Sequence, residues 1–208
     1  MQSSNSQMNM QAFYHGSSAL FTKFDLAHVL TGTAKVKFGY GVYLTSSFKS
    51  AAHYSAANKD ADTHYVYTVE ILEITDTNHI TFKQPVHPAI ITHAEEQLGF
   101  SIPEKFTLDG KDFRKFLAKH FEKHICIDLA AGQSLEEALH LAGEQAASEF
   151  LTSIGVDFIT WPYSWKNPAL GTNICVLDEN NIKIIKVEQV ELDAKQQLIA
   201  GSEREIQI

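Results

Sequence analysis

Two stretches near the start of the chain decide its fold: FYHGSS (13–18) and FGYGVYLTSSFKSAAHYS (38–55). The residues AFYH (12–15) favour a short strand that ends at Gly16, and GVYLT (41–45) favours a second strand. A helix is expected to follow at once, with Ser46 or Ser47 as its N-cap and an end near Asn58. One face of this helix carries residues at the spacing i, i+3, i+4, i+7 and is expected to pack on a sheet: Phe48, Ala51, Ala52 and Ser55.

In the rest of the chain, the sequence pattern changes from strand to helix and back to strand. HYVYTVEILEI (64–74) alternates between two faces and predicts a strand. From residue 85 to about residue 153 the apolar spacing is helical, and Ser134 with Glu137 forms a capping-box pattern. Strands are predicted again at 158–161, 173–177 and 182–192, the last two as a hairpin joined by a polar turn.

These elements predict an α+β protein with a helical insertion. The expected domain covers residues 11–193, and the insertion covers residues 85–150 within it. Residues 1–10 are rich in Ser, Asn, Gln and Met and are expected to be disordered. Residues 194–208 form a polar tail with no clear pattern.

The composition limits the class of protein. The 208 residues include 17 Lys plus Arg and 25 Asp plus Glu, a net charge of −8, which argues against a basic nucleic-acid-binding stripe. A hydrophobic share of 44% is enough to close a core. Cys126 and Cys175 stand among apolar residues and are interpreted as small buried side chains in a reducing compartment. With no signal peptide and no long apolar run, we expect a cytoplasmic protein, or one delivered into a target cell by another route.

The N-terminal stretches also carry residues suited to a dinucleotide. His15 and Gly16 place an imidazole beside bare backbone at a strand end, and Gly39 and Gly41 leave room for a flat ligand. Tyr43 and Tyr54 offer two aromatic faces that could sandwich a nicotinamide ring, although either one could instead pack in the core. Taken alone, His15 would more often be a structural histidine at the end of a strand, and it is the neighbouring Gly16 and Ser17 with the two downstream tyrosines that favour a functional role.

This ordered set resembles the ADP-ribosyltransferases of the poly(ADP-ribose) polymerase and diphtheria-toxin type. Their pattern is a His-Gly-Ser strand, then Phe-Gly-x-Gly-(Ile/Val)-Tyr, then a helix with a second Tyr. The segments ASEFLTSIGVDFITWP (147–162) and GTNICVLDENNIKII (171–185) resemble the closing part of bacterial and phage-borne relatives, including domains of polyvalent proteins. The resemblance covers pieces at both ends of the chain and leaves the helical middle unexplained.

The resemblance implies a split antiparallel β-sheet fold and NAD as a co-substrate. It implies nicotinamide and ribose contacts from His15, Gly16, Tyr43 and Tyr54, with Ser17 extending the first of them. Gly41 would leave space beside the ligand, and Lys49 could meet the pyrophosphate. The implied activity is mono-ADP-ribosyl transfer to a macromolecule by a monomeric effector, toxin or phage protein. The expected acceptor is a protein, with a nucleic acid as an open alternative.

The chain departs from this family at its third signature position. Active members place a Glu there, whereas the matching residue here is Asn173, which cannot take a proton or supply negative charge. Glu149, Asp157 or Asp178 could supply a carboxylate, but Asp157 suits a turn and Glu149 a solvent-facing helix surface. The alternative function is therefore a binding module for NAD or ADP-ribose that has little or no turnover and acts through protein interaction.

Two further patterns carry competing interpretations. His120 and His124 lie four residues apart in HFEKH and could hold zinc on one helix face, but no third ligand is placed, so we predict no metal site. Trp161 and Trp165 flank Pro162 and Tyr163 in an aromatic segment. This segment could line an acceptor site or cover the edge of the sheet.

Overall fold

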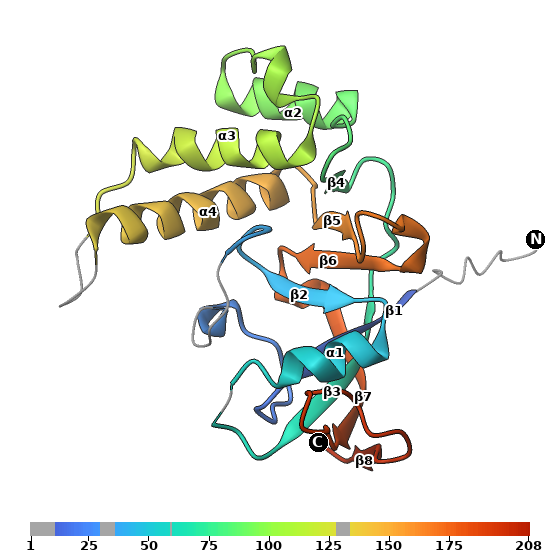
Figure 1. The fold of residues 1–208 in the computed structure, drawn as a ribbon. Helices are drawn as coiled ribbons and strands as arrows, with labels where there is room; N and C mark the ends of the chain where they lie inside the picture. Colours follow the sequence, from blue (N-terminus) through green and yellow to red (C-terminus); the bar gives the residue numbers. More distant parts are fainter. Residues whose placement is uncertain (1–10, 30–35, 59, 128–133) are drawn as a thin grey trace, which may run out of the picture. The chain divides into compact units, whose positions relative to one another are not determined.

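The structure, a computed structural model, describes residues 11–29, 36–58, 60–127 and 134–208 (Figure 1). In these residues it contains eight β-strands and four α-helices, which confirms the α+β class. The chain forms two compact units: unit 1 has residues 1–24, 44–74 and 180–208, and unit 2 has residues 25–43 and 75–179. Segment 1–10, expected to be disordered, lies outside the described residues.

Unit 1 is built on an antiparallel sheet. Its strands are β1 (Gln11–Ser17), the end of β2 (Val42–Thr45), β3 (His64–Ile71), β7 (Ile182–Val190) and β8 (Arg204–Ile206). Their order is β2-β1-β3-β7-β8. β1 pairs with β3 from Gln11 opposite Ile71 to Ser17 opposite Tyr65. β3 pairs with β7 along its whole length, with an irregularity between Thr68 and Val69.

Alternation along β3 explains how unit 1 buries its core. Tyr67, Val69 and Ile71 point to one face of the sheet and are fully buried, as the sequence pattern predicts. On the other face, Val66 packs with Val190 under helix α1 (Phe48–Ser55). Ser47 caps this helix by accepting a hydrogen bond from the Ser50 N–H at 3.3 Å.

Unit 2 combines a small sheet with three α-helices among its described residues. The strands are β4 (His79–Thr81), β5 (Phe158–Pro162) and β6 (Thr172–Val176), with β4 parallel and β6 antiparallel to β5. The helices are α2 (Pro88–Leu98), α3 (Gly110–Glu122) and α4 (Leu135–Ser153). These helices confirm the helical structure predicted between residues 85 and 153.

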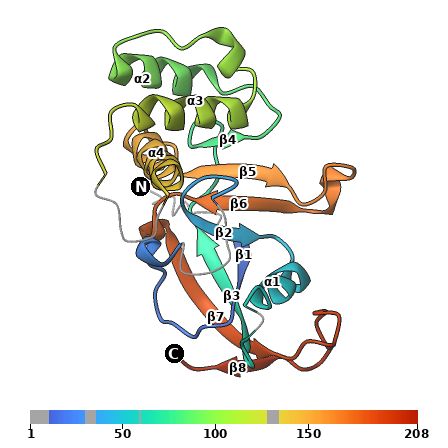
Figure 2. The same ribbon diagram turned by 60° about the vertical axis from the view of Figure 1, so that its left-hand side comes forward.

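Helices α3 and α4 lie side by side and carry the core of unit 2 (Figure 1, Figure 2). Phe113 and Leu117 of α3 and Ala147 and Leu151 of α4 are all completely buried in one cluster. A Cβ on Gly143 would lie 2.8 Å from the Ala118 carbonyl oxygen, so the glycine allows the two helices to approach closely.

Three expectations from the sequence need correction. The hairpin of 173–177 with 182–192 is wrong, because β6 pairs with β5 in unit 2 and β7 pairs with β3 and β8 in unit 1. Strands β4 and β8 are not predicted from the sequence, and β8 lies in the polar tail. Cys126 is exposed, whereas Cys175 is buried as expected.

Among the described residues, no helix combines the length and the apolar character needed to cross a membrane.

Candidate functional site

The residues that the sequence assigns to the site belong to both units. Unit 1 holds His15, Gly16, Ser17, Lys49 and Tyr54, and unit 2 holds Gly41, Tyr43, Glu149 and Asn173. Each group has its own environment, set by the elements of its unit.

His15 lies in an aromatic setting at the end of β1. Its ring meets the Phe24 ring edge-on, with centroids 5.1 Å apart, and lies 6.2 Å from the rings of Phe21 and Tyr67. Phe21 in turn stacks on Tyr67 at 4.2 Å. These contacts fix the plane of the half-buried imidazole on one face of the strand.

The Tyr67 hydroxyl holds the segment after β1 in place. It accepts a hydrogen bond from the Phe21 N–H at 2.8 Å and donates one to the Ala19 carbonyl at 3.0 Å. Burial raises the pKa of this phenol to about 12; the Phe21 hydrogen bond lowers it by a smaller amount, and Tyr65 adds a small further increase. Tyr67 thus positions the residues that surround His15. The only sequence signal for this role is the place of Tyr67 in the alternating pattern of β3.

Gly16 is required by the packing of helix α1. A Cβ at this position would lie 1.8 Å from the Ala51 carbonyl oxygen and 2.8 Å from the Ser55 nitrogen. Tyr14, on the same face of β1, meets the Phe48 ring edge-on at 5.5 Å. The helix therefore rests directly on the strand, and only glycine fits beneath it.

The other unit 1 residues lie near the surface. Tyr54 is 53% exposed on α1, with its ring 6.0 Å from the His53 ring. Lys49 is exposed on the same helix. Ser17 uses its hydroxyl oxygen to accept a hydrogen bond from the Ala19 N–H at 3.0 Å. Helix α1 thus presents an aromatic ring and a cation that solvent or a ligand can reach.

Tyr43 closes its own loop in unit 2. Its hydroxyl donates to the Gly39 carbonyl at 2.8 Å and accepts from the Phe38 N–H at 3.0 Å. Its ring meets Trp161 edge-on at 5.8 Å. Burial, and then Cys175, raise the pKa of the Tyr43 phenol well above its ordinary value. Tyr43 therefore has a packing role, which is one of the two roles that the sequence leaves open.

Gly39 and Gly41 allow the same loop to pack on β5 and β6. A Cβ at Gly41 would lie 2.4 Å from the Val176 carbonyl oxygen. At Gly39 it would lie 2.7 Å from the Ile159 Cδ1, and the φ angle of +119° also favours glycine. Protein atoms thus occupy the space beside both glycines in which the sequence leaves room for a flat ligand.

Asn173 lies on β6 opposite Trp161 and is 7% exposed. Its side-chain oxygen has no hydrogen-bond partner in the described part of the chain. A buried amide oxygen without a partner is uncommon in proteins and is one mark of a position that serves a ligand.

The carboxylates considered as substitutes lie elsewhere in unit 2. Glu149 is exposed on α4, where it accepts a hydrogen bond from the Gln145 amide at 2.9 Å. It also helps to raise the pKa of Tyr40, an effect due first to burial and then to Glu149, Asp25 and Glu179. The solvent-facing interpretation of Glu149 is confirmed. The backbone of Asp157 joins two segments, because its N–H donates to the Asn78 carbonyl at 2.8 Å and its carbonyl accepts from the Leu177 N–H at 2.9 Å.

An ion pair that the sequence does not predict lies between helices α3 and α4. Arg114 contacts Glu144, and both side chains are 2% exposed. Arg114 also donates to the Lys37 carbonyl at 3.4 Å, next to the loop that Tyr43 closes. Burial lowers the pKa of Arg114, while Tyr43 and Cys175 oppose this effect. A sequence signal does exist, because each charge falls within the apolar stripe of its helix.

The remaining candidates separate into core and surface. Trp161 is buried and stacks on Phe38 at 4.0 Å, whereas Trp165 is 44% exposed beneath the Lys83 ammonium at 4.2 Å. The rings of His120 and His124 lie 5.3 Å apart. Within residues 11–29, 36–58, 60–127 and 134–208, no group of three or more His, Cys, Asp or Glu side chains could hold a metal ion.

Comparisons of this chain with protein families, with curated proteins and with solved structures found no match.

Proposed function

We propose that this chain is a mono-ADP-ribosyltransferase with a split-sheet ADP-ribosyltransferase fold. One observation carries the proposal: the His15-Gly16 end of β1 lies directly beneath α1, the helix that carries Tyr54. The sequence motif requires this order of strand, glycine and helix, and a glycine under a closely packed helix supports it. Tyr43 and Asn173 occupy β2 and β6, later strands in the same chain order.

The proposed reaction breaks the bond between nicotinamide and its ribose. Nicotinamide leaves as a neutral amide, a nucleophile on the acceptor attacks C1′ of the ribose, and the proton of the nucleophile passes to solvent or to a base. In unit 1, His15 would bond a ribose hydroxyl, the Gly16 backbone would bond the carboxamide, and the Tyr54 ring would stack on the nicotinamide. Ser17 and Lys49 would contact the pyrophosphate end. The acceptor proposed is a protein side chain.

Asn173 limits how fast this reaction can run. Its free amide oxygen can accept a hydrogen bond from a ribose hydroxyl, but it carries no negative charge to stabilise the developing cation. The proposed turnover is therefore slow and stops at a single ADP-ribose. Glu149, exposed on α4, is the carboxylate proposed to assist.

The burial of Asn173 favours a second candidate function. A 7% exposed amide in place of a carboxylate suits a module that binds NAD or ADP-ribose without cleaving NAD. Calorimetry with each ligand tests both candidates together, because both require measurable affinity for NAD or ADP-ribose. A chain with neither function would bind neither ligand.

The test of catalysis measures nicotinamide release from NAD by the purified protein. Asn173→Glu is expected to raise the rate about tenfold or more, because it restores a negative charge that can stabilise the developing cation. Tyr54→Ala is expected to abolish binding without unfolding the protein, since Tyr54 is 53% exposed. Tyr163→Ala is the matched control for nicotinamide release, because Tyr163 is a 44% exposed tyrosine that is not among the residues proposed to contact NAD.

Three outcomes separate the possibilities. Release by the wild type that Tyr54→Ala abolishes supports the transferase. Binding of NAD with no release, even by Asn173→Glu, supports the module without turnover. Absence of NAD and ADP-ribose binding, or equal effects of Tyr54→Ala and Tyr163→Ala, overturns both.

A further inference from the structure

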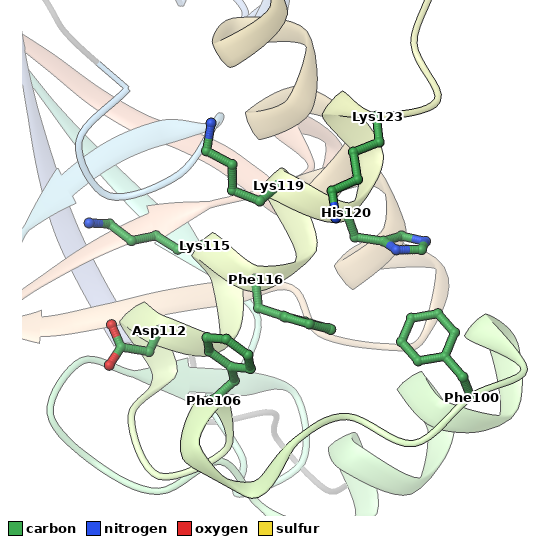
Figure 3. Close-up of a pocket in the computed structure, with 8 residues that line it drawn as sticks. All are labelled: Phe100, Phe106, Asp112, Lys115, Phe116, Lys119, His120 and Lys123. Atoms are coloured by element: carbon green, nitrogen blue, oxygen red, sulfur yellow. The ribbon is translucent and has the colours of Figure 1, made fainter.

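We propose that a hollow on the outer face of helix α3 binds a small organic anion with a planar aromatic ring. The hollow lies wholly within unit 2, between α3 and the segment that follows α2 (Figure 3). Its volume of about 540 Å³ lies within the range of small-molecule sites. None of its lining residues belongs to the proposed NAD site, so this inference stands independently of the proposed function.

The wall of the hollow is aromatic. Phe106 stacks on Phe116 with ring centroids 4.7 Å apart, and Phe100 meets Phe116 edge-on at 6.4 Å. The His120 ring lies 5.1 Å from the Phe100 ring, and Figure 3 shows these rings gathered along the hollow. Phe100 is 39% exposed. Such a wall favours a flat ring, because rings stack or meet edge-on with additional gain beyond the buried area.

His120 contributes an uncharged ring to this wall. Burial lowers its pKa, and the neighbouring His124 and Lys123 lower it further. The imidazole is therefore neutral at neutral pH and does not repel an apolar ligand. It can also exchange a hydrogen bond with a polar substituent on that ligand.

The rim of the hollow is cationic. Lys115, Lys119 and Lys123 recur every four residues, so they follow one side of α3 in steps of roughly 6 Å. All three lysines are exposed, and the Lys119 ammonium also bonds Glu122 at 2.5 Å. Among the described residues that line the hollow, Asp112 is the one that is acidic. Three lysines beside a largely apolar wall, in a chain of net charge −8, complement an anionic head group attached to a ring.

Two dyes that differ chiefly in charge test both features of the site. The probe is 8-anilinonaphthalene-1-sulfonate, an aromatic anion whose fluorescence rises in apolar surroundings, and the uncharged comparison is N-phenyl-1-naphthylamine. We expect one equivalent of the sulfonate to bind, more tightly than the neutral dye by about tenfold, with the difference shrinking as salt is added. Equal affinities for the two dyes would overturn the anionic part of the proposal.

Variants locate the binding. Phe100→Ala is expected to weaken the binding of both dyes. Because Phe100 is partly exposed, we expect this variant to keep its fold. The double variant Lys115→Gln/Lys123→Gln is expected to lower the affinity for the sulfonate about tenfold and to leave the affinity for the neutral dye unchanged. Its matched control is Lys23→Gln/Lys195→Gln, which removes two exposed lysines of unit 1. Absence of dye binding, several equivalent sites unaffected by Phe100→Ala, or equal losses in the two double variants would each overturn the site.

Discussion

At the scale of single residues, Tyr67 links stability to pH. Its phenol has a pKa of about 12 in the folded chain, against about 10 in an unfolded chain. Between these values the folded state holds more protons, so Tyr67 stabilises the fold fully below pH 10, and this contribution is lost as the pH rises through 12. Tyr67→Phe is expected to cost about 1–2 kcal/mol at pH 8, since it removes bonds to Phe21 and Ala19.

Urea unfolding of wild type and Tyr67→Phe at several pH values checks this expectation. The difference between the two proteins should be constant from pH 7 to 9 and should shrink above pH 10. The pKa of Tyr43 is also raised, so Tyr43 adds its own pH dependence to the stability. This contribution cancels in the difference, because both proteins contain Tyr43. Tyr163→Phe, at an exposed position, should match the wild type at pH 8. A difference that grows with alkaline pH would contradict the assigned role.

Glycines show how far single residues of the candidate site can be predicted from the sequence. The motif identifies Gly16, Gly39 and Gly41 as places where backbone must come close to something, and that inference is sound. It does not identify the neighbour. At Gly16 the neighbour is Ala51 of α1, and at Gly41 it is Val176 of β6. These contacts join segments far apart in the sequence, which local spacing cannot reveal.

At the scale of elements, the Arg114–Glu144 ion pair opposes the separation of α3 from α4. Removing one partner leaves a buried charge without compensation, so Arg114→Met or Glu144→Leu is expected to destabilise unit 2 by about 3–5 kcal/mol. The double variant Arg114→Met/Glu144→Leu is expected to recover most of this loss, because apolar side chains of similar size can fill the same space. The measurement is the free energy of urea unfolding, followed by helical circular dichroism.

Lys119→Met provides the control for this pair. Lys119 bonds Glu122 on the same helix, but its side chain is 71% exposed, so its loss is expected to cost less than about 1 kcal/mol. Single variants at Arg114 and Glu144 that behave like Lys119→Met would show that the buried pair contributes nothing special. A double variant as unstable as the worse single variant would show that the polar atoms are themselves required.

Elements with strong periodicity are predictable, and those defined by their partners are not. The eight-residue alternation of β3 and the capping box of α4 identify both elements, because each pattern reflects a local constraint. The hairpin prediction fails because the short polar turn after Leu177 does not determine pairing. Instead, β7 pairs with the whole of β3. Strands β4 and β8 have three residues each and depend on β5 and β7 for their hydrogen bonds.

At the scale of the whole molecule, the chain supports two cores with different chain topologies. Unit 1 is assembled from three separate segments, 1–24, 44–74 and 180–208, whereas most of unit 2 is the continuous stretch 75–179. Each unit buries its own apolar cluster, with Val66 and Val190 in one and Phe113 and Leu117 in the other. Local opening should therefore follow the units, because cooperative opening tends to respect such contact boundaries.

Hydrogen exchange in matched core variants tests this expectation. Leu117→Ala in unit 2 and Ile71→Ala in unit 1 remove fully buried side chains, each at a cost of about 2–5 kcal/mol. Leu117→Ala should accelerate exchange in 110–122 and 135–153 far more than in 64–71 and 182–190, and Ile71→Ala should give the reverse pattern. Equal acceleration in both units by either variant would mean that the chain opens as one cooperative body. Unit-specific acceleration would mean that unit 2 can open while the strand and helix that carry His15 and Tyr54 stay folded.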